Sequence, residues 1–249
     1  MNNSILSSEG NFRYLVTQRI KHFWGYGSLD SDTWFVGMEE GCDGSIPKLI
    51  KRFEQTAHGE VFDICDDMRS EPDHMDWFKD GAATQPTYRK LIYLLLYFQN
   101  KKEPTLEDIR AYQINHFGRK KGNHAVLELM PLPARSLNVK DWVYASSGIE
   151  GLESRREYLK KYKPERVKRL RELIQKHKPK LVIFYSMGYL KDWKEAVEVS
   201  FNNVIDGKLY IAKDDSTLYA IVPHSVAHKM SNTDWKEIAE KIMKGMGRS

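Results

Sequence analysis

Residues 180–185 (KLVIFY) form a continuous apolar run, and Ser186-Met187-Gly188 then turns the chain toward the next helical pattern. A short apolar run between turn residues is typical of a strand that is buried on both faces of a sheet. Similar runs occur at residues 33–37 (TWFVG), 125–130 (AVLELM), 209–211 and 218–222. We therefore predict that these five segments are strands of one sheet.

Helical patterns separate the predicted strands. They lie at residues 6–23, 47–53, 86–99, 153–178 and 231–246. Apolar strands that alternate with helices predict an α/β fold, a three-layer sandwich around a central, mostly parallel sheet. The chain has no internal repeat, low-complexity tract or linker, so we expect residues 1–249 to form one domain, in which residues 54–84 match no pattern.

The composition is that of an ordinary globular protein, with 41% hydrophobic and 29% charged residues. The longest apolar run, residues 91–98, is too short to span a membrane, and the first residues lack the pattern of a signal peptide. We therefore expect a cytoplasmic monomer without a membrane partner. Cys42 and Cys65 form no CxxC pair and the histidines are scattered, so we expect reduced thiols and no metal site.

The positive charge is concentrated in one segment. Residues 154–180 hold twelve Lys or Arg and three Glu, a net charge of +9, whereas the whole chain carries +5 and the remainder therefore −4. Such a stripe is what a phosphate backbone attracts, and it is also what a solvated helix face looks like. Both interpretations stay open from charge alone.

Polar residues follow three of the predicted strands. The sequence has Glu39 and Glu40 after the first strand, Glu128 near the end of the second, and His224 after the last. Ligands of open α/β sheets bind beyond the carboxyl ends of the strands. We therefore expect these carboxylates and the histidine to converge on one crevice, as a set suited to general acid–base or electrostatic catalysis.

These segments also resemble a known family. The motif GMEEG at residues 37–41 resembles the first motif of the uracil-DNA glycosylase superfamily, a strand followed by glycine and a water-activating Asp or Asn. Glu39 stands at that position, and Glu40 stands where relatives have proline. LVIFYSMG at 181–188 and IVPHSVAHKM at 221–230 resemble two further motifs, with His224 at the histidine position. The resemblance spans residues 34–230, with a long insertion around 54–123, and implies a uracil-DNA-glycosylase-like fold.

The resemblance implies cleavage of an N-glycosidic bond after the nucleotide is flipped out of DNA. Glu39 would stabilise the sugar cation and orient water, and His224 would donate a hydrogen bond to the departing base. Gly37, Met38, Glu40 and Ser225 would contact the substrate. No lysine is placed as a Schiff-base nucleophile, so we expect a monofunctional enzyme that needs no cofactor.

Glu128 bears on the choice of base. Relatives have an asparagine there that reads uracil, whereas an ionised carboxylate only accepts hydrogen bonds and suits the amino group of cytosine. We therefore expect a modified cytosine rather than uracil as substrate, with residues 54–84 reading the modification. Phe53 or Phe62 is the expected stacking partner of the flipped base. Such an activity would serve DNA repair or defence against phage DNA.

The expected DNA contacts lie mainly in the loop after His224. Val226 and Met230 are candidates for an apolar wedge that unstacks the duplex, while His228 and Lys229 would contact phosphates. Arg135 is either a further phosphate contact or a surface residue. The basic loop at residues 118–122 is a further candidate for DNA contact.

Simpler interpretations of these residues exist. Glu39 and Glu40 would then be exposed loop carboxylates, Glu128 would face water from an edge strand, and His224 would be structural. The alternative function is a non-catalytic nucleic-acid-binding module on the same fold. An unrelated α/β hydrolase is a third alternative, which the absence of a GxSxG or P-loop motif disfavours.

Overall fold

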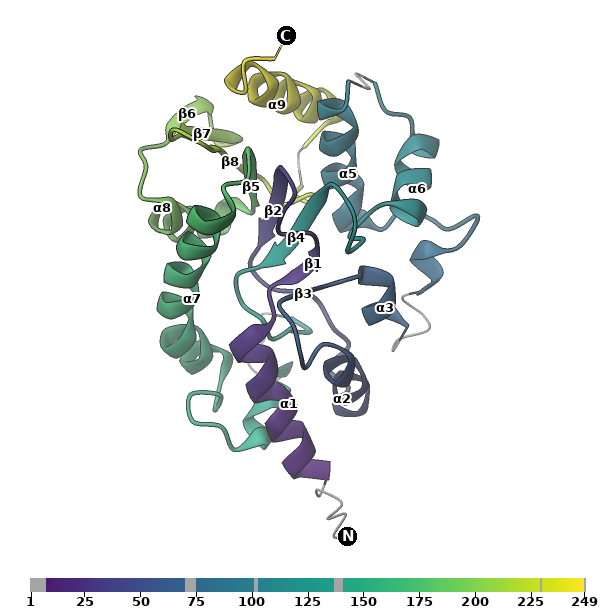
Figure 1. The fold of residues 1–249 in the computed structure, drawn as a ribbon, viewed down its shortest axis with the longest axis vertical. Coiled ribbons are helices and arrows are strands. Elements are labelled where there is room, and N and C mark those ends of the chain that lie inside the picture. The colour runs from purple at the N-terminus through teal and green to yellow at the C-terminus, as the bar shows by residue number, and fades with distance from the viewer. Residues whose placement is uncertain (1–7, 70–74, 101–102, 137–140, 229, 249) are drawn as a thin grey trace.

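The computed structural model describes residues 8–69, 75–100, 103–136, 141–228 and 230–248. Strands and helices alternate along these residues, and the strands gather in the middle of the molecule (Figure 1). The strands are β1 (Gly25–Gly27), β2 (Thr33–Gly37), β3 (Val61–Phe62), β4 (His124–Glu128), β5 (Leu181–Tyr185), β6 (Asn202–Ile205), β7 (Leu209–Lys213) and β8 (Leu218–Val222). The helices are α1 (Ser8–His22), α2 (Ile46–Gln55), α3 (Ile64–Met68), α5 (Pro86–Phe98), α6 (Leu106–Asn115), α7 (Arg155–His177), α8 (Leu190–Val197) and α9 (Asn232–Gly245).

Within the described ranges, the strands form one eight-stranded sheet in the order β3-β1-β4-β2-β5-β8-β7-β6. The four central strands, β4, β2, β5 and β8, run parallel to one another. At one edge β7 and β6 are antiparallel additions, and at the other edge β1 pairs antiparallel with β4 and parallel with β3. The predicted α/β class with a mostly parallel sheet is therefore confirmed.

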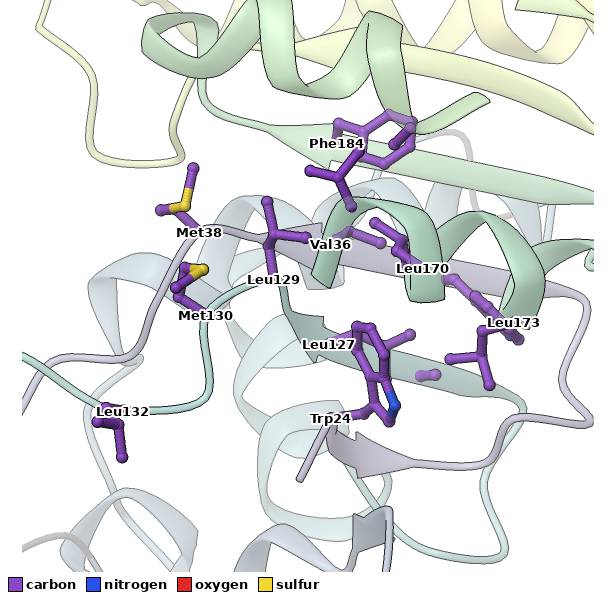
Figure 2. Packing of buried hydrophobic residues seen from close by; sticks show 14 of the residues in the cluster. Trp24, Val36, Met38, Leu127, Leu129, Met130, Leu132, Leu170, Leu173 and Phe184 are labelled. Atoms are coloured by element: carbon purple, nitrogen blue, oxygen red, sulfur yellow. The ribbon is translucent and has the colours of Figure 1, made fainter. Parts of the chain in front are cut away.

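Helices cover both faces of the sheet, because successive side chains of each strand point to opposite faces. Trp34 and Val36 of β2 belong to a core that α1, α2, α7 and α8 cover, whereas Phe35 belongs to a second core under α3, α5, α6 and α9. Figure 2 shows the first core, with Val36 and Phe184 of the sheet facing Leu170 of α7. Two covered faces are consistent with a three-layer sandwich.

The predicted elements with long apolar patterns lie where expected. The strands at 33–37 and 218–222 have the predicted bounds, and the helix predicted at 86–99 is α5. The unassigned residues 54–84 contain β3, α3 and a short 3-10 helix, η1 (Asp76–Phe78). The described residues contain no helix that combines the length and the apolar character needed to cross a membrane.

The basic helix α7 is less solvated than its charge suggests. Leu170, Leu173 and Ile174 of this helix are buried. Arg166 is also buried, and its guanidinium stacks 3.4 Å from the centre of the Trp24 ring and donates to three backbone carbonyls. Part of the positive charge of this segment therefore belongs to the interior of the fold rather than to an open surface.

Candidate functional site

The register of the central strands places their carboxyl ends side by side, where the predicted site residues lie. Gly37, the last residue of β2, lies beside Glu128, the last residue of β4. Tyr185 ends β5 beside Val222, the last residue of β8. A pocket of about 580 Å³ opens at these carboxyl ends. Its lining includes Tyr26, Glu39, Glu40, Arg52, Trp77, Phe78, Gln85, Thr87, Tyr88, Glu128, Tyr185 and His224.

Glu39 is held by the first residue of α7. Arg155 donates to Glu39 Oε1 from Nε at 3.0 Å and from a terminal nitrogen at 2.5 Å, and the Glu39 side chain is only 10% exposed. Glu39 Oε2 is buried and has no hydrogen-bond partner among the described residues. Burial raises the pKa of Glu39 above its ordinary value, and Arg155 opposes this rise. Glu39 is thus an oriented carboxyl group in the pocket, not an exposed loop residue.

Glu40 belongs to a buried ionic network behind Glu39. Its two oxygens accept from Arg19 and Arg52, each at 2.6 Å, and Oε1 also accepts from the Tyr26 hydroxyl at 2.6 Å. Arg52 donates in addition to Asp67 at 2.8 Å. The two arginine side chains are 0% and 2% exposed. This network joins α1, β1, α2 and α3 to the loop after β2, and it fixes the backbone that presents Glu39.

Glu128 lies in the interior of the sheet. Strand β4 runs between β1 and β2, and the residue is only 7% exposed, so the edge-strand interpretation is wrong. The Tyr185 hydroxyl donates to Glu128 Oε1 at 2.9 Å, whereas Oε2 is buried without a partner among the described residues. Gly37 makes room for this pair, because a Cβ there would lie 2.4 Å from the Tyr185 oxygen and 2.6 Å from Glu128 Oε2.

The pKa of Glu128 bears on the expected ionised form of this side chain. Burial, and next the negative charge of Glu40, raise the pKa of Glu128 well above its ordinary value of 4.5, and the Tyr185 hydrogen bond opposes this rise. This rise in pKa favours the neutral form of the group over the expected ionised, acceptor-only form. A neutral carboxyl group offers one O–H donor beside an acceptor oxygen.

His224 supplies a hydrogen-bond donor to the same pocket. Its ring is half-buried and lies 5.8 Å from the ring of Tyr185. Burial lowers the pKa of His224, so the ring is neutral at pH 7. The backbone N–H of Val226 donates to Nδ1 at 3.4 Å, which assigns the ring proton to Nε2. A neutral histidine in this tautomer donates a hydrogen bond from Nε2.

Several residues expected at the substrate lie elsewhere. The proposed stacking role of Phe53 is wrong, because its ring is fully buried and stacks on Tyr144 at 6.4 Å. Phe62 stacks on Phe23 at 6.0 Å and does not line the pocket. The Met38 side chain points into the first core, near Leu129 and Met130 (Figure 2).

The expected DNA contacts have different exposures. Arg135 and His228 are exposed, and Val226 is exposed to 50%, so these three remain accessible to a ligand. Met230 packs against the second core and is a poor wedge. Lys229 lies outside the described residues.

Ser225 is buried and does not line the pocket, and its hydroxyl has no partner among the described residues. Several residues of the site carry no signal in the sequence pattern. Tyr185 stands in an apolar run that predicts only a buried strand, although the hydroxyl of a buried tyrosine usually finds a hydrogen-bond partner. Arg155 and Arg52 each stand next to other basic residues in the sequence, and nothing in the sequence marks them as partners of Glu39 and Glu40.

Within the described ranges, no group of three or more His, Cys, Asp or Glu side chains is placed to hold a metal ion. Comparison of the chain with models of protein families, with curated proteins and with solved structures gives no match. The side chains of the pocket itself therefore indicate what it can do.

Proposed function

We propose that this protein is a monofunctional DNA glycosylase, a remote member of the uracil-DNA glycosylase superfamily, that excises a modified base in repair or in phage defence. One observation carries the proposal. A single pocket at the carboxyl ends of the parallel strands contains an oriented carboxyl group, Glu39, a neutral histidine donor, His224, and a buried hydrogen-bonding group, Glu128. These are the groups that cleavage of a base–sugar bond requires.

The chemistry follows from the charges that develop during cleavage. As the C1′–N bond breaks, its electron pair leaves with the base, and the sugar becomes oxocarbenium-like. The Glu39 carboxylate stabilises this cation and accepts a hydrogen bond from the water whose oxygen bonds to C1′. A proton from that water ends on the departing base. His224 Nε2–H donates to the base as negative charge grows there, a contribution of typically ~10²–10³ in rate.

The neutral Glu128 carboxyl group matches a base edge that has an acceptor beside a donor. Its O–H can donate to N3 of cytosine while its other oxygen accepts from the exocyclic amino group. The same group also matches a lactam edge such as that of uracil, with the donor and acceptor roles exchanged. The edge alone therefore does not select cytosine, and the preference for a modified cytosine now rests on the space around the base.

The pocket has room for more than a flat base. Its volume of about 580 Å³ lies within the ~300–1,000 Å³ that small-molecule sites occupy. Trp77 and Phe78, from the segment that the sequence left unassigned, line it together with Gln85 and Thr87. Their aromatic rings can stack on a base, and the polar side chains can bind a substituent. This arrangement supports a substrate base that carries an added group.

The experiment is an assay for abasic sites. Wild-type protein is incubated with DNA that contains uracil or one of several modified cytosines, and alkali-labile sites are counted. We expect cleavage of at least one modified-cytosine substrate, a loss of at least ~100-fold in Glu39→Gln, and unchanged activity in Glu172→Gln, which alters an exposed carboxylate on α7. Retained DNA binding without abasic sites on any substrate would instead support the non-catalytic binding module.

A further inference from the structure

A second groove lies between α5, α6 and α9, outside the pocket described above. In Figure 1, α5 lies between α6 and α9, and all three belong to the same face of the sheet. The groove has a volume of about 420 Å³. Arg89, Lys90 and Tyr93 of α5 form one wall, Asn232 and Lys236 of α9 form another, and Glu103 lies at its edge before α6.

The groove carries an excess of positive charge. Its lining has three cationic residues, and Glu103 is the acidic residue among them. Glu103 accepts from Lys236 at 2.9 Å, so the charge of Lys236 is compensated. Arg89 and Lys90 form no ion pair with any carboxylate in the described part of the chain. Two neighbouring cations thus face the groove without an acidic partner.

The half-buried Lys90 is the more constrained of these two cations. Its Nζ donates to Asn232 Oδ1 at 2.6 Å, which bridges α5 and α9 across the groove. Burial, and next the positive charge of Arg89, lower the pKa of Lys90. An anion bound between the two side chains would relieve their repulsion and accept their N–H donors. The groove is therefore suited to a phosphate group rather than to a neutral or cationic ligand.

The groove and the pocket are both lined by residues of α5. On α5, Thr87 and Tyr88 line the pocket, and the next residues, Arg89 and Lys90, line the groove. These positions fall within one helical turn, about 5.4 Å along the axis. The loop that starts at His224 leads to Asn232 at the start of α9. A strand with one nucleotide in the pocket would therefore have its backbone close to the groove.

We infer that this groove binds the phosphodiester backbone next to the nucleotide held in the pocket, with Arg89 and Lys90 as the phosphate ligands. The inference rests on the proposed action on DNA, but it concerns a different surface from the expected contacts after His224 and on α7. It predicts a contribution to DNA affinity that does not depend on the base in the pocket.

The test is DNA binding as a function of salt. The full-length Arg89→Gln/Lys90→Gln variant is compared with Lys241→Gln/Lys244→Gln, which removes two exposed cations from the far end of α9. The probe is a fluorescein-labelled duplex of unmodified bases, and the dissociation constant is measured by anisotropy over a range of KCl concentrations. Thermal unfolding of both variants confirms that they are folded.

We expect the groove variant to bind more weakly at each salt concentration, and its slope of log K against log salt to be shallower by about 1.8, since each phosphate contact contributes ~0.9. The control should keep the wild-type slope. Equal slopes for both variants, or no binding by wild type, would overturn the inference. Because the readout is binding, a shallower slope in a protein that releases no base would uphold the groove and refute only the glycosylase. Base release with an unchanged slope would instead uphold the glycosylase and refute the groove.

Discussion

Replacement of Arg52 by methionine tests whether the ionic network behind the pocket stabilises the fold. The Arg52 side chain is 2% exposed, and it donates to Asp67 at 2.8 Å, to Glu40 at 2.6 Å and to the Tyr26 oxygen at 2.5 Å. Methionine fills much of the volume but removes the guanidinium that both carboxylates share. Glu40 keeps its bond to Arg19, and the fully buried Asp67 loses the bond from Arg52 but still accepts from the Tyr26 hydroxyl.

Breaking a buried ion pair by removing one partner typically costs roughly 3–5 kcal/mol, because the remaining charge stays in the interior without its counter-charge. For a chain of this size that corresponds to a fall in Tm of roughly 6–20 °C. The assay is urea and thermal unfolding of Arg52→Met beside Lys180→Met. Lys180 pairs with Asp32 at 2.7 Å, but both side chains are more than 60% exposed, so we expect that control to change stability by less than ~1 kcal/mol. An Arg52→Met effect as small as that of the control would refute the structural role of the network.

Three further predictions follow from buried groups. Because burial raises the folded pKa of Glu128, the stability that it contributes is complete below its ordinary value of 4.5 and is lost as the pH rises through the folded pKa. Glutamine does not titrate, so the free energy of unfolding of Glu128→Gln in urea should exceed that of wild type by a growing amount as the pH rises above that value. Equal pH profiles for the two proteins would contradict the raised pKa of Glu128. Burial lowers the pKa of His124 to about 4, against an ordinary 6.5, so its contribution is complete above pH 6.5 and is lost as the pH falls toward 4. The total loss in the free energy of unfolding is about 3 kcal/mol. A midpoint near 6.5 in an NMR titration of His124 would rule this out. Gly37→Ala should displace the hydrogen-bonded pair of Tyr185 and Glu128. It should lower the free energy of unfolding by ~1–3 kcal/mol and reduce base release. Wild-type values for both the stability and the base release would show that the pair can shift freely.

Much of the fold could be predicted from the sequence because its central strands are buried on both faces. Such strands leave continuous apolar runs, and β2, β5 and β8 were located from them. β1 was missed because its sequence, GYG, has no such run. Its glycines are needed for close packing, since a Cβ on Gly25 or Gly27 would lie 2.1 or 2.2 Å from a carbonyl oxygen of β4. The helix α6 was also missed, although Thr105 and Asp108 form a capping box that the sequence displays.

The candidate site was predictable only in part. Strand order and register place Glu39, Glu128 and His224 around one pocket, and the rule that ligands bind at carboxyl ends of strands anticipates this. The burial of these side chains and their hydrogen-bond partners could not be predicted, because both depend on residues that are far away in the chain. Arg155 is 116 positions from Glu39, and the burial that raises the pKa of Glu128 depends on packing that no local pattern reports.

The central claim is that this pocket breaks a base–sugar bond in DNA, and the most direct test is to detect the free base. Duplexes that carry uracil, cytosine or modified cytosines are incubated with excess protein, and the small molecules released are identified by mass spectrometry. We expect release of an intact modified base from one of these duplexes, with an abasic site formed in equal amount, and no release by Glu39→Gln. Tight DNA binding with no base released from any duplex would contradict it.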